Sequence, residues 1–256
     1  MRKWLIFYPS LPFFMAATFL VTVAGCNNGL PSLVESANGQ TWIPIADTAF
    51  LIPDKTWLKG YGHRKSDGLI AHISLHAMAP DAQPWSEEVQ DLMYPKVGGW
   101  GRRIVISVKE IDPDSKFSGR FQSFPQSLWG GGRLVEESSD LEAHGWHKFR
   151  EETGKAGKIN TGRIFYEYLE NGVVKYFSSC SNSQGKPGHT SSCRLIFPYA
   201  NKLRVTMVFQ RLYMPEGAVM AGVIENELAE FEAAGQSILA AKLKDNKHDL
   251  KEIISK

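Results

Sequence analysis

The sequence predicts an α+β fold in which an antiparallel sheet meander is packed by a long C-terminal helix. The first observation is a hairpin. Residues 163–170 and 173–179 have the composition of strands, and Asn171-Gly172 between them supplies the two positive φ angles of a type I′ turn. The second is another pair of apolar runs, 193–199 and 203–212, separated by a short turn. The third is an apolar stripe at helical spacing that follows these runs.

The last strand and the helix are expected to pack against each other. Alternate residues of the strand are apolar, which places them on one face: Leu203, Val205, Met207 and Phe209. The helix is predicted over residues 216–244, and its stripe consists of Ile224, Leu228, Phe231, Ile238 and Leu239. We expect this stripe to cover one face of the meander, with a helix that binds a partner as the alternative.

The N-terminal half is less regular. Residues 69–78, 103–111 and 117–124 resemble strands, and residues 84–94 resemble a short helix that starts at a proline. The segment 125–160 is rich in Gly, Ser and charged residues, which is typical of a boundary. We therefore predict two similar α+β halves, residues 41–135 and 136–246, with one continuous α+β domain as the alternative.

The N-terminus has the pattern of a secretory leader. Arg2 and Lys3 precede residues 4–25, which carry no charge, and the segment ends in Val23-Ala24-Gly25-Cys26. This ending resembles the lipobox of bacterial lipoproteins, so we expect residues 1–25 to be a signal peptide and Cys26 to be lipidated. Asn27 after the cysteine resembles outer-membrane sorting, with the protein facing the periplasm. Residues 26–40 are interpreted as a tether, and an uncleaved membrane anchor is the alternative.

The two remaining cysteines fit an oxidising compartment. Cys180 and Cys193 flank a loop rich in turn-forming residues, and an exported chain favours a disulfide between them over two free thiols. Closing a loop of this size stabilises a fold by about 3 kcal/mol. A metal site is disfavoured because the pair and the nearby His189 leave one ligand missing.

Charge argues against nucleic-acid binding. The chain carries 29 basic and 27 acidic residues, and Arg2 and Lys3 of the leader account for the whole excess. A nucleic-acid-binding protein needs clustered cations that displace counterions. We therefore expect a protein partner and contact with the membrane through the lipid anchor, and no nucleic acid.

No catalytic motif stands out, and the sequence predicts a non-enzyme without a cofactor. There is no G-x-S-x-G elbow and no P-loop. His72 and His76 alternate with apolar residues, which predicts a strand that holds them about 13 Å apart, at roughly 3.3 Å per residue, too far for one metal ion. His144 and His147, with Glu142, are the candidates for a hydrolase or metal group. Four tryptophans fall in or near predicted loops, where they could anchor a partner: Trp85, Trp100, Trp129 and Trp146.

Taken in order, these features resemble the periplasmic immunity lipoproteins that protect Gram-negative bacteria from type VI secretion phospholipase effectors. The resemblance is carried by the lipobox, by residues 48–55 (TAFLIPDK), and by residues 193–197 (CRLIF) with 203–209 and the helix. It implies a lipid-anchored protein that neutralises a lipase toxin by occluding its active site. The alternatives are a structural or assembly lipoprotein of the outer membrane and a hydrolase that uses the His144/His147 region.

Overall fold

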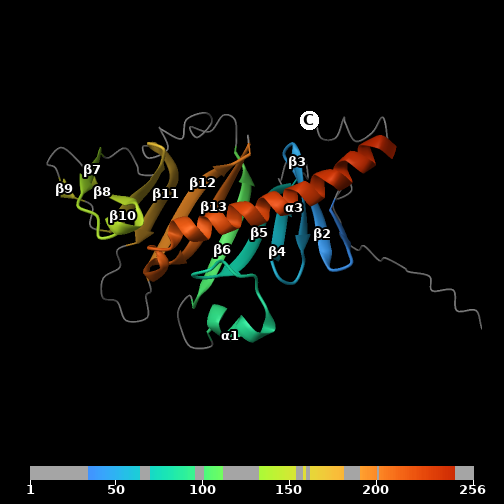
Figure 1. Ribbon diagram of the computed structural model, residues 1–256, viewed down its shortest axis with the longest axis horizontal. Coiled ribbons are helices and arrows are strands. Elements are labelled where there is room, and N and C mark those ends of the chain that lie inside the picture. The colour runs from blue at the N-terminus through green and yellow to red at the C-terminus, as the bar shows by residue number, and fades with distance from the viewer. Residues whose placement is uncertain are drawn as a thin grey trace, which may run out of the picture.

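The computed structural model describes residues 34–63, 70–95, 101–111, 133–153, 158–159, 162–181, 191–200 and 202–245. These residues form two antiparallel sheets and a long C-terminal helix, which confirms the α+β class (Figure 1). The leader, Cys26, the strand expected over 117–124, His189, Trp100 and Trp129 lie outside the described residues.

The larger sheet has ten strands, with the spatial order β4-β5-β6-β13-β12-β11-β10-β8-β7, and β9 pairs with β8. Every pairing is antiparallel. The strands are β4 (Leu58–His63), β5 (Ile70–Met78), β6 (Arg103–Glu110), β7 (Arg133–Glu137), β8 (Trp146–Thr153), β9 (Lys158–Ile159), β10 (Arg163–Glu170), β11 (Val173–Ser181), β12 (Ser192–Tyr199) and β13 (Leu203–Gln210).

The expected hairpin and meander are present. Asn171 and Gly172 have φ angles of 53° and 77°, so the left-handed turn that the sequence predicts joins β10 to β11. The alternate apolar residues of β13 are buried and the residues between them are partly exposed, as predicted. Strand β6 pairs with β13, so strands from both predicted halves lie in the same sheet. The division into two similar halves remains a prediction.

The segment expected to be a boundary, 125–160, contains three of these strands, β7, β8 and β9. Strand β7 crosses the expected limit between residues 135 and 136, and β8 pairs with both β7 and β10. Trp146 lies at the start of β8, next to the turn, and is fully buried in the core, so it is not available as an anchor for a partner. Its neighbour Gly145 has a φ angle of 79°, which lets the chain turn from a 3₁₀ helix (Glu142–His144) into the strand.

The smaller sheet has the order β1-β2-β3, with β1 (Glu35–Ala37), β2 (Gln40–Ile45) and β3 (Thr48–Pro53). Asn38 and Gly39, with φ angles of 54° and 74°, form the turn between β1 and β2. The end of the segment expected to be a tether is therefore ordered as a hairpin, because its Asn-Gly pair turns the chain back on itself. Strand β3 packs on the C-terminal helix, and β2 contacts β5.

The C-terminal helix α3 (Gly217–Asp245) lies across one face of the larger sheet and continues over the smaller sheet (Figure 1). Its predicted stripe faces the core: Ile224, Leu228, Phe231 and Leu239 are buried, and Ile238 packs on a cluster with Trp42. Polar contacts supplement this packing, since the hydroxyls of Tyr176 and Tyr199 donate to Glu225 at 2.9 Å and to Glu232 at 2.8 Å.

Near its C-terminal end, α3 approaches the smaller sheet closely at a glycine. A Cβ atom on Gly235 would lie 2.3 Å from the Ala49 carbonyl oxygen of β3. The Trp42 indole N–H donates to the Gly235 carbonyl at 3.0 Å. Among the helices that the structure describes, none combines the length and the apolar character needed to cross a membrane.

The short helix between β5 and β6 is smaller than expected. A 3₁₀ turn (Glu87–Val89) leads into α1 (Gln90–Met93), whereas the sequence predicts a helix over 84–94. Ser86 makes no side-chain cap at its start. Pro95 disfavours helical backbone at Tyr94, which has φ −130° and ψ 71° and ends the helix. A further 3₁₀ turn (Arg211–Tyr213) connects β13 to α3.

Candidate functional site

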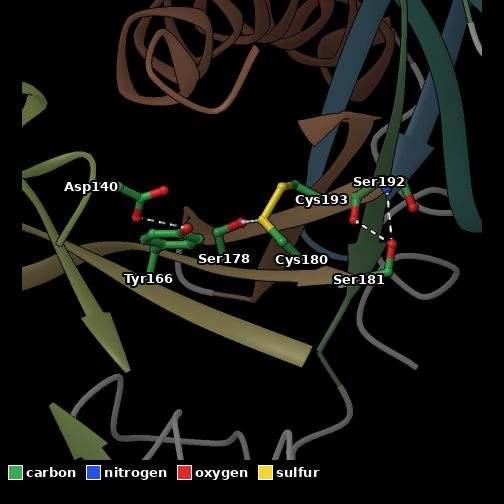
Figure 2. Close-up of a disulfide and its surroundings, with 7 residues drawn as sticks. All are labelled: Asp140, Tyr166, Ser178, Cys180, Ser181, Ser192 and Cys193. Atoms are coloured by element: carbon green, nitrogen blue, oxygen red, sulfur yellow. Dashed lines mark hydrogen bonds between the residues drawn. A yellow bond between two sulfur atoms is a disulfide. The ribbon is translucent and has the colours of Figure 1, made fainter. Parts of the chain in front are cut away.

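The disulfide expected from the sequence is present between β11 and β12. Cys180 and Cys193 are directly opposite residues of the two strands, and both are fully buried (Figure 2). Next to the bond, the Ser192 N–H donates to Ser181 Oγ at 3.0 Å, and the Ser181 hydroxyl donates to the Ser192 carbonyl at 3.3 Å. The bond therefore joins the two strands where the intervening loop leaves the sheet.

A cavity of about 360 Å³ lies where β13 leads into α3. It is lined by Asp140, Leu141, Tyr166, Arg211, Leu212, Met214 and Pro215. The Tyr166 hydroxyl donates to Asp140 Oδ1 at 3.3 Å (Figure 2). Burial, and then the Asp140 carboxylate, raise the pKa of Tyr166, so the phenol stays neutral. The charges of Asp140 and Arg211 act on the Tyr166 phenol in opposite directions. Because this phenol stays neutral, the cavity offers no activated nucleophile among its lining residues.

The histidines proposed for a hydrolase do not form a metal group. His147 Nδ1 lies 3.2 Å from Glu136 Oε1, and both side chains are exposed. His144 is exposed in the 3₁₀ turn before Gly145, together with Glu142. Among the described residues, no group of three His, Cys, Asp or Glu side chains is placed to hold a metal ion. In the described structure, Glu142, His144 and His147 are therefore not brought together as a three-ligand group.

The other histidine pair lies on β5, as the alternation predicts. His76 is nearly buried: its Nδ1 lies 2.7 Å from the Tyr94 hydroxyl, and its ring stacks on Trp85 at a centroid distance of 6.3 Å. The Lys59 ammonium and the Arg103 guanidinium lie 5.8 Å and 5.0 Å from the centre of the Tyr94 ring. Burial lowers the pKa of His76, and these two cations lower it further.

This cluster belongs to the face of the larger sheet that points away from α3, which we name the outer face. Its central part consists of alternate residues of β5, β6, β13 and β12, aligned by the strand register in three rows. The rows are His72, Lys109, Arg204 and Pro198; Ser74, Ser107, Thr206 and Ile196; and His76, Val105, Val208 and Arg194. Rows lie about 6.7 Å apart and strands about 4.8 Å apart.

The outer face is cationic there, and most of its side chains are exposed or partly exposed, whereas His76 and Ile196 are buried. Lys59, Lys109 and Arg194 are exposed, and among the described residues none of these three has an ion-pair partner. Arg103 and Arg204 are partly exposed beside them. On the described strands β5, β6, β12 and β13, the residues of this face include no Asp or Glu. Burial, and then the Arg194 guanidinium, lower the pKa of Arg204, which indicates repulsion between these cations.

Sequence reasoning did not find this patch. Its cations are spread over four strands that are far apart in the sequence, and they meet only because β6 pairs with β13. The alternation in β13 could have indicated that Arg204 points away from the helix. Without knowledge that β6 pairs with β13, the alternation identifies only Arg204 and not the other cations of the patch.

No protein-family model matches the chain, and no curated protein matches it. Among solved structures, the fold is similar to that of Smlt3025, an immunity protein of the Stenotrophomonas maltophilia type IV secretion system, with a TM-score of 0.53 and 16% sequence identity. The similarity covers 77% of this chain and 98% of that chain. FrpD, an iron-regulated outer membrane lipoprotein of Neisseria meningitidis, gives a TM-score of 0.45 and 11% identity, covering 78% of this chain and 100% of that chain. The similarity to Smlt3025 shows a shared fold.

Proposed function

We propose that this chain is a lipid-anchored periplasmic immunity protein that binds a toxic lipase and blocks its active site. Cys26 carries the lipid, Asn27 directs the protein to the outer membrane, and the folded part faces the periplasm. The toxin is a phospholipase effector of a type VI secretion system. The chain acts by binding, without catalysis and without a cofactor.

The observation that carries this proposal is the fold that the chain shares with Smlt3025 over nearly the whole of that protein. One fold can serve several functions, so the site must supply the rest of the argument. The Cys180–Cys193 disulfide is in keeping with an oxidising periplasm. The type VI lipase class comes from the sequence resemblance, whereas Smlt3025 is an immunity protein of a type IV system.

Steric occlusion requires a stable, rigid surface of sufficient size. A specific interface covers about 800 Å² on each partner. In this chain, α3 and the core occupy one face of the larger sheet. On the outer face Lys109 and Arg194 are exposed, and Ser74, Ser107 and Thr206 are partly exposed. A hydrogen-bonded sheet changes little on binding, which keeps the entropic cost of association low.

The direct test is protection of living cells. A lipase-like protein encoded beside the gene of this chain is produced in the periplasm of a susceptible bacterium, with and without this chain. We expect cells to lose viability with the toxin alone and to survive when both are present. A catalytically inactive toxin controls for toxicity of production itself, and death in the presence of both proteins would refute the immunity function.

The anchor is tested separately. Labelled palmitate should enter the wild-type chain but not Cys26→Ser, and the variant should be lost from the outer-membrane fraction. Without the acyl chains, little remains to hold the protein at a bilayer. A wild-type protein that carries no acyl group, or a variant that stays in the outer membrane, would contradict the proposed anchor.

A further inference from the structure

We infer that the outer face of β5, β6, β13 and β12 docks an acidic surface of the protein partner, with Lys109 and Arg194 contacting its carboxylates. This inference rests on the proposed function for the statement that the partner is a protein. It adds which side of the molecule makes the contact and which chemistry the partner must present.

The first step is the concentration of positive charge. Four cationic side chains lie on this part of the outer face, and Lys59 lies beside it on β4: the four are Arg103, Lys109, Arg194 and Arg204. The whole chain carries a net charge of only +2, so the patch is a local excess and not a general property of the protein. Such an excess steers an oppositely charged surface into one orientation and speeds association.

The second step is that these cations repel one another. The pKa of Arg204 is lowered by burial and by Arg194, and the pKa of Lys59 is lowered by burial and by Arg103. Carboxylates that pair with Lys109 and Arg194 would offset part of this positive charge. A guanidinium also presents paired N–H donors that match the two oxygens of a carboxylate.

The third step concerns the side chains between the cations. Ser74, Ser107 and Thr206 form one row in the middle of the patch, and all three are partly exposed. Small hydroxyl side chains let another surface approach closely, and they donate hydrogen bonds to its carboxylates or carbonyls. The middle of the patch therefore offers hydroxyl groups to a polar surface, with the buried Ile196 at the β12 end of the row.

A membrane surface fits the patch less well than a protein does. The large apolar residues that are exposed among the described parts of the chain are Tyr61, Leu92, Leu169, Val173, Leu212 and Val219. None of them lies on β5, β6, β12 or β13, so this part of the face has no apolar anchor for a bilayer. Anionic vesicles are accordingly a competing outcome of the test.

The probe is fluorescently labelled poly-L-glutamate, added to the purified full-length lipoprotein in neutral detergent. Anisotropy measures its affinity, and a carbodiimide then couples its carboxylates to lysines in contact. We expect cross-links at Lys59 and Lys109 in preference to Lys202 and Lys242, which lie on a turn and on α3. Phosphatidylglycerol vesicles without poly-L-glutamate form the second arm.

The test variant is Lys109→Glu/Arg194→Glu, and the matched control is Lys202→Glu/Lys242→Glu, which changes the net charge by the same amount. Lys109, Arg194 and Lys202 are exposed, and Lys242 is partly exposed. Charges in such positions contribute little to stability, so both variants should fold, and their melting temperatures verify this. We expect the test variant to bind poly-L-glutamate on the order of ten-fold more weakly, and the control to bind within about two-fold of wild type.

Several results would overturn the inference: no binding of poly-L-glutamate by wild type, equal weakening in both variants, cross-links mainly at Lys202 and Lys242, or binding of vesicles in preference to the peptide. The protection assay separates this inference from the proposed function. If the test variant protects cells from the toxin as well as wild type does, the inferred docking face is wrong and the proposed immunity function is retained. If poly-L-glutamate binds as expected but wild type does not protect cells from the toxin, the proposed immunity function is wrong.

Discussion

Two glycines of α3 should respond in opposite directions when each is replaced by alanine. Alanine is favoured over glycine inside a helix by about 1 kcal/mol. At Gly222 an added Cβ atom would have no neighbour within 4 Å, so Gly222→Ala should stabilise the protein by about 0.5–1 kcal/mol. This variant measures the helix propensity alone and serves as the internal control.

At Gly235 the same change meets the backbone of β3. The new Cβ atom would lie 2.3 Å from the Ala49 carbonyl oxygen and 2.7 Å from the Phe50 carbonyl carbon, and neither atom can rotate away. The helix must move off the smaller sheet, which costs about 1–3 kcal/mol as overpacking and weakens the buried Trp42 hydrogen bond by about 1 kcal/mol. After the propensity gain is subtracted, Gly235→Ala should destabilise the protein by about 1–3 kcal/mol.

The assay is urea unfolding followed by tryptophan fluorescence, with linear extrapolation of the free energy of unfolding for wild type and both variants. The two variants should differ by about 2–4 kcal/mol, well above the uncertainty of such measurements. If Gly235→Ala were as stable as Gly222→Ala, the close packing of α3 on β3 would be wrong.

Three further outcomes are expected. Replacing Cys180 and Cys193 by serine should lower the free energy of unfolding by about 3 kcal/mol, because their 13-residue separation no longer restricts the unfolded chain; an unchanged denaturation midpoint would contradict this. Unfolded His76 binds a proton below about pH 6.5 while the folded residue resists it, so stability should fall as pH drops below that value. His76→Gln should remove this part of the pH dependence, and parallel wild-type and variant stability curves would contradict it. Gly172→Ala should cost about 1 kcal/mol in thermal unfolding, since its φ of 77° disfavours a Cβ atom although space is open; an unaffected melting temperature would oppose this.

The parts of the fold that the sequence predicts are those encoded over short distances. Asn171-Gly172 sets a local turn, the alternation in β13 defines its buried face, and the stripe of α3 is read from helical spacing. Each needs only a few neighbouring residues. The Cys180–Cys193 bond is similar, because the pair closes a short loop within one hairpin.

The parts that the sequence does not predict depend on distant segments. Strand β8 contains many charged residues, a composition that is typical of a loop. It is nevertheless part of the sheet, because Trp146 at its start is buried beneath the start of α3, where Gly217 leaves room for the indole ring. Strand β1 and the turn that leads into β2 lie in a segment whose polar residues suggest a tether. The cationic patch requires the alignment of Lys109 with Arg204, which no local pattern contains.

The pairing of β6 with β13 also has a consequence for the growing polypeptide. When β4, β5 and β6 have been synthesised, one edge of β6 offers unsatisfied N–H and C=O groups, and its partner is still about a hundred residues from completion. The open edge of β6 is paired only when β13 is available. Until then, the incomplete sheet could pair with a strand of another chain. Shielding that edge during biogenesis is a task this topology imposes on the cell.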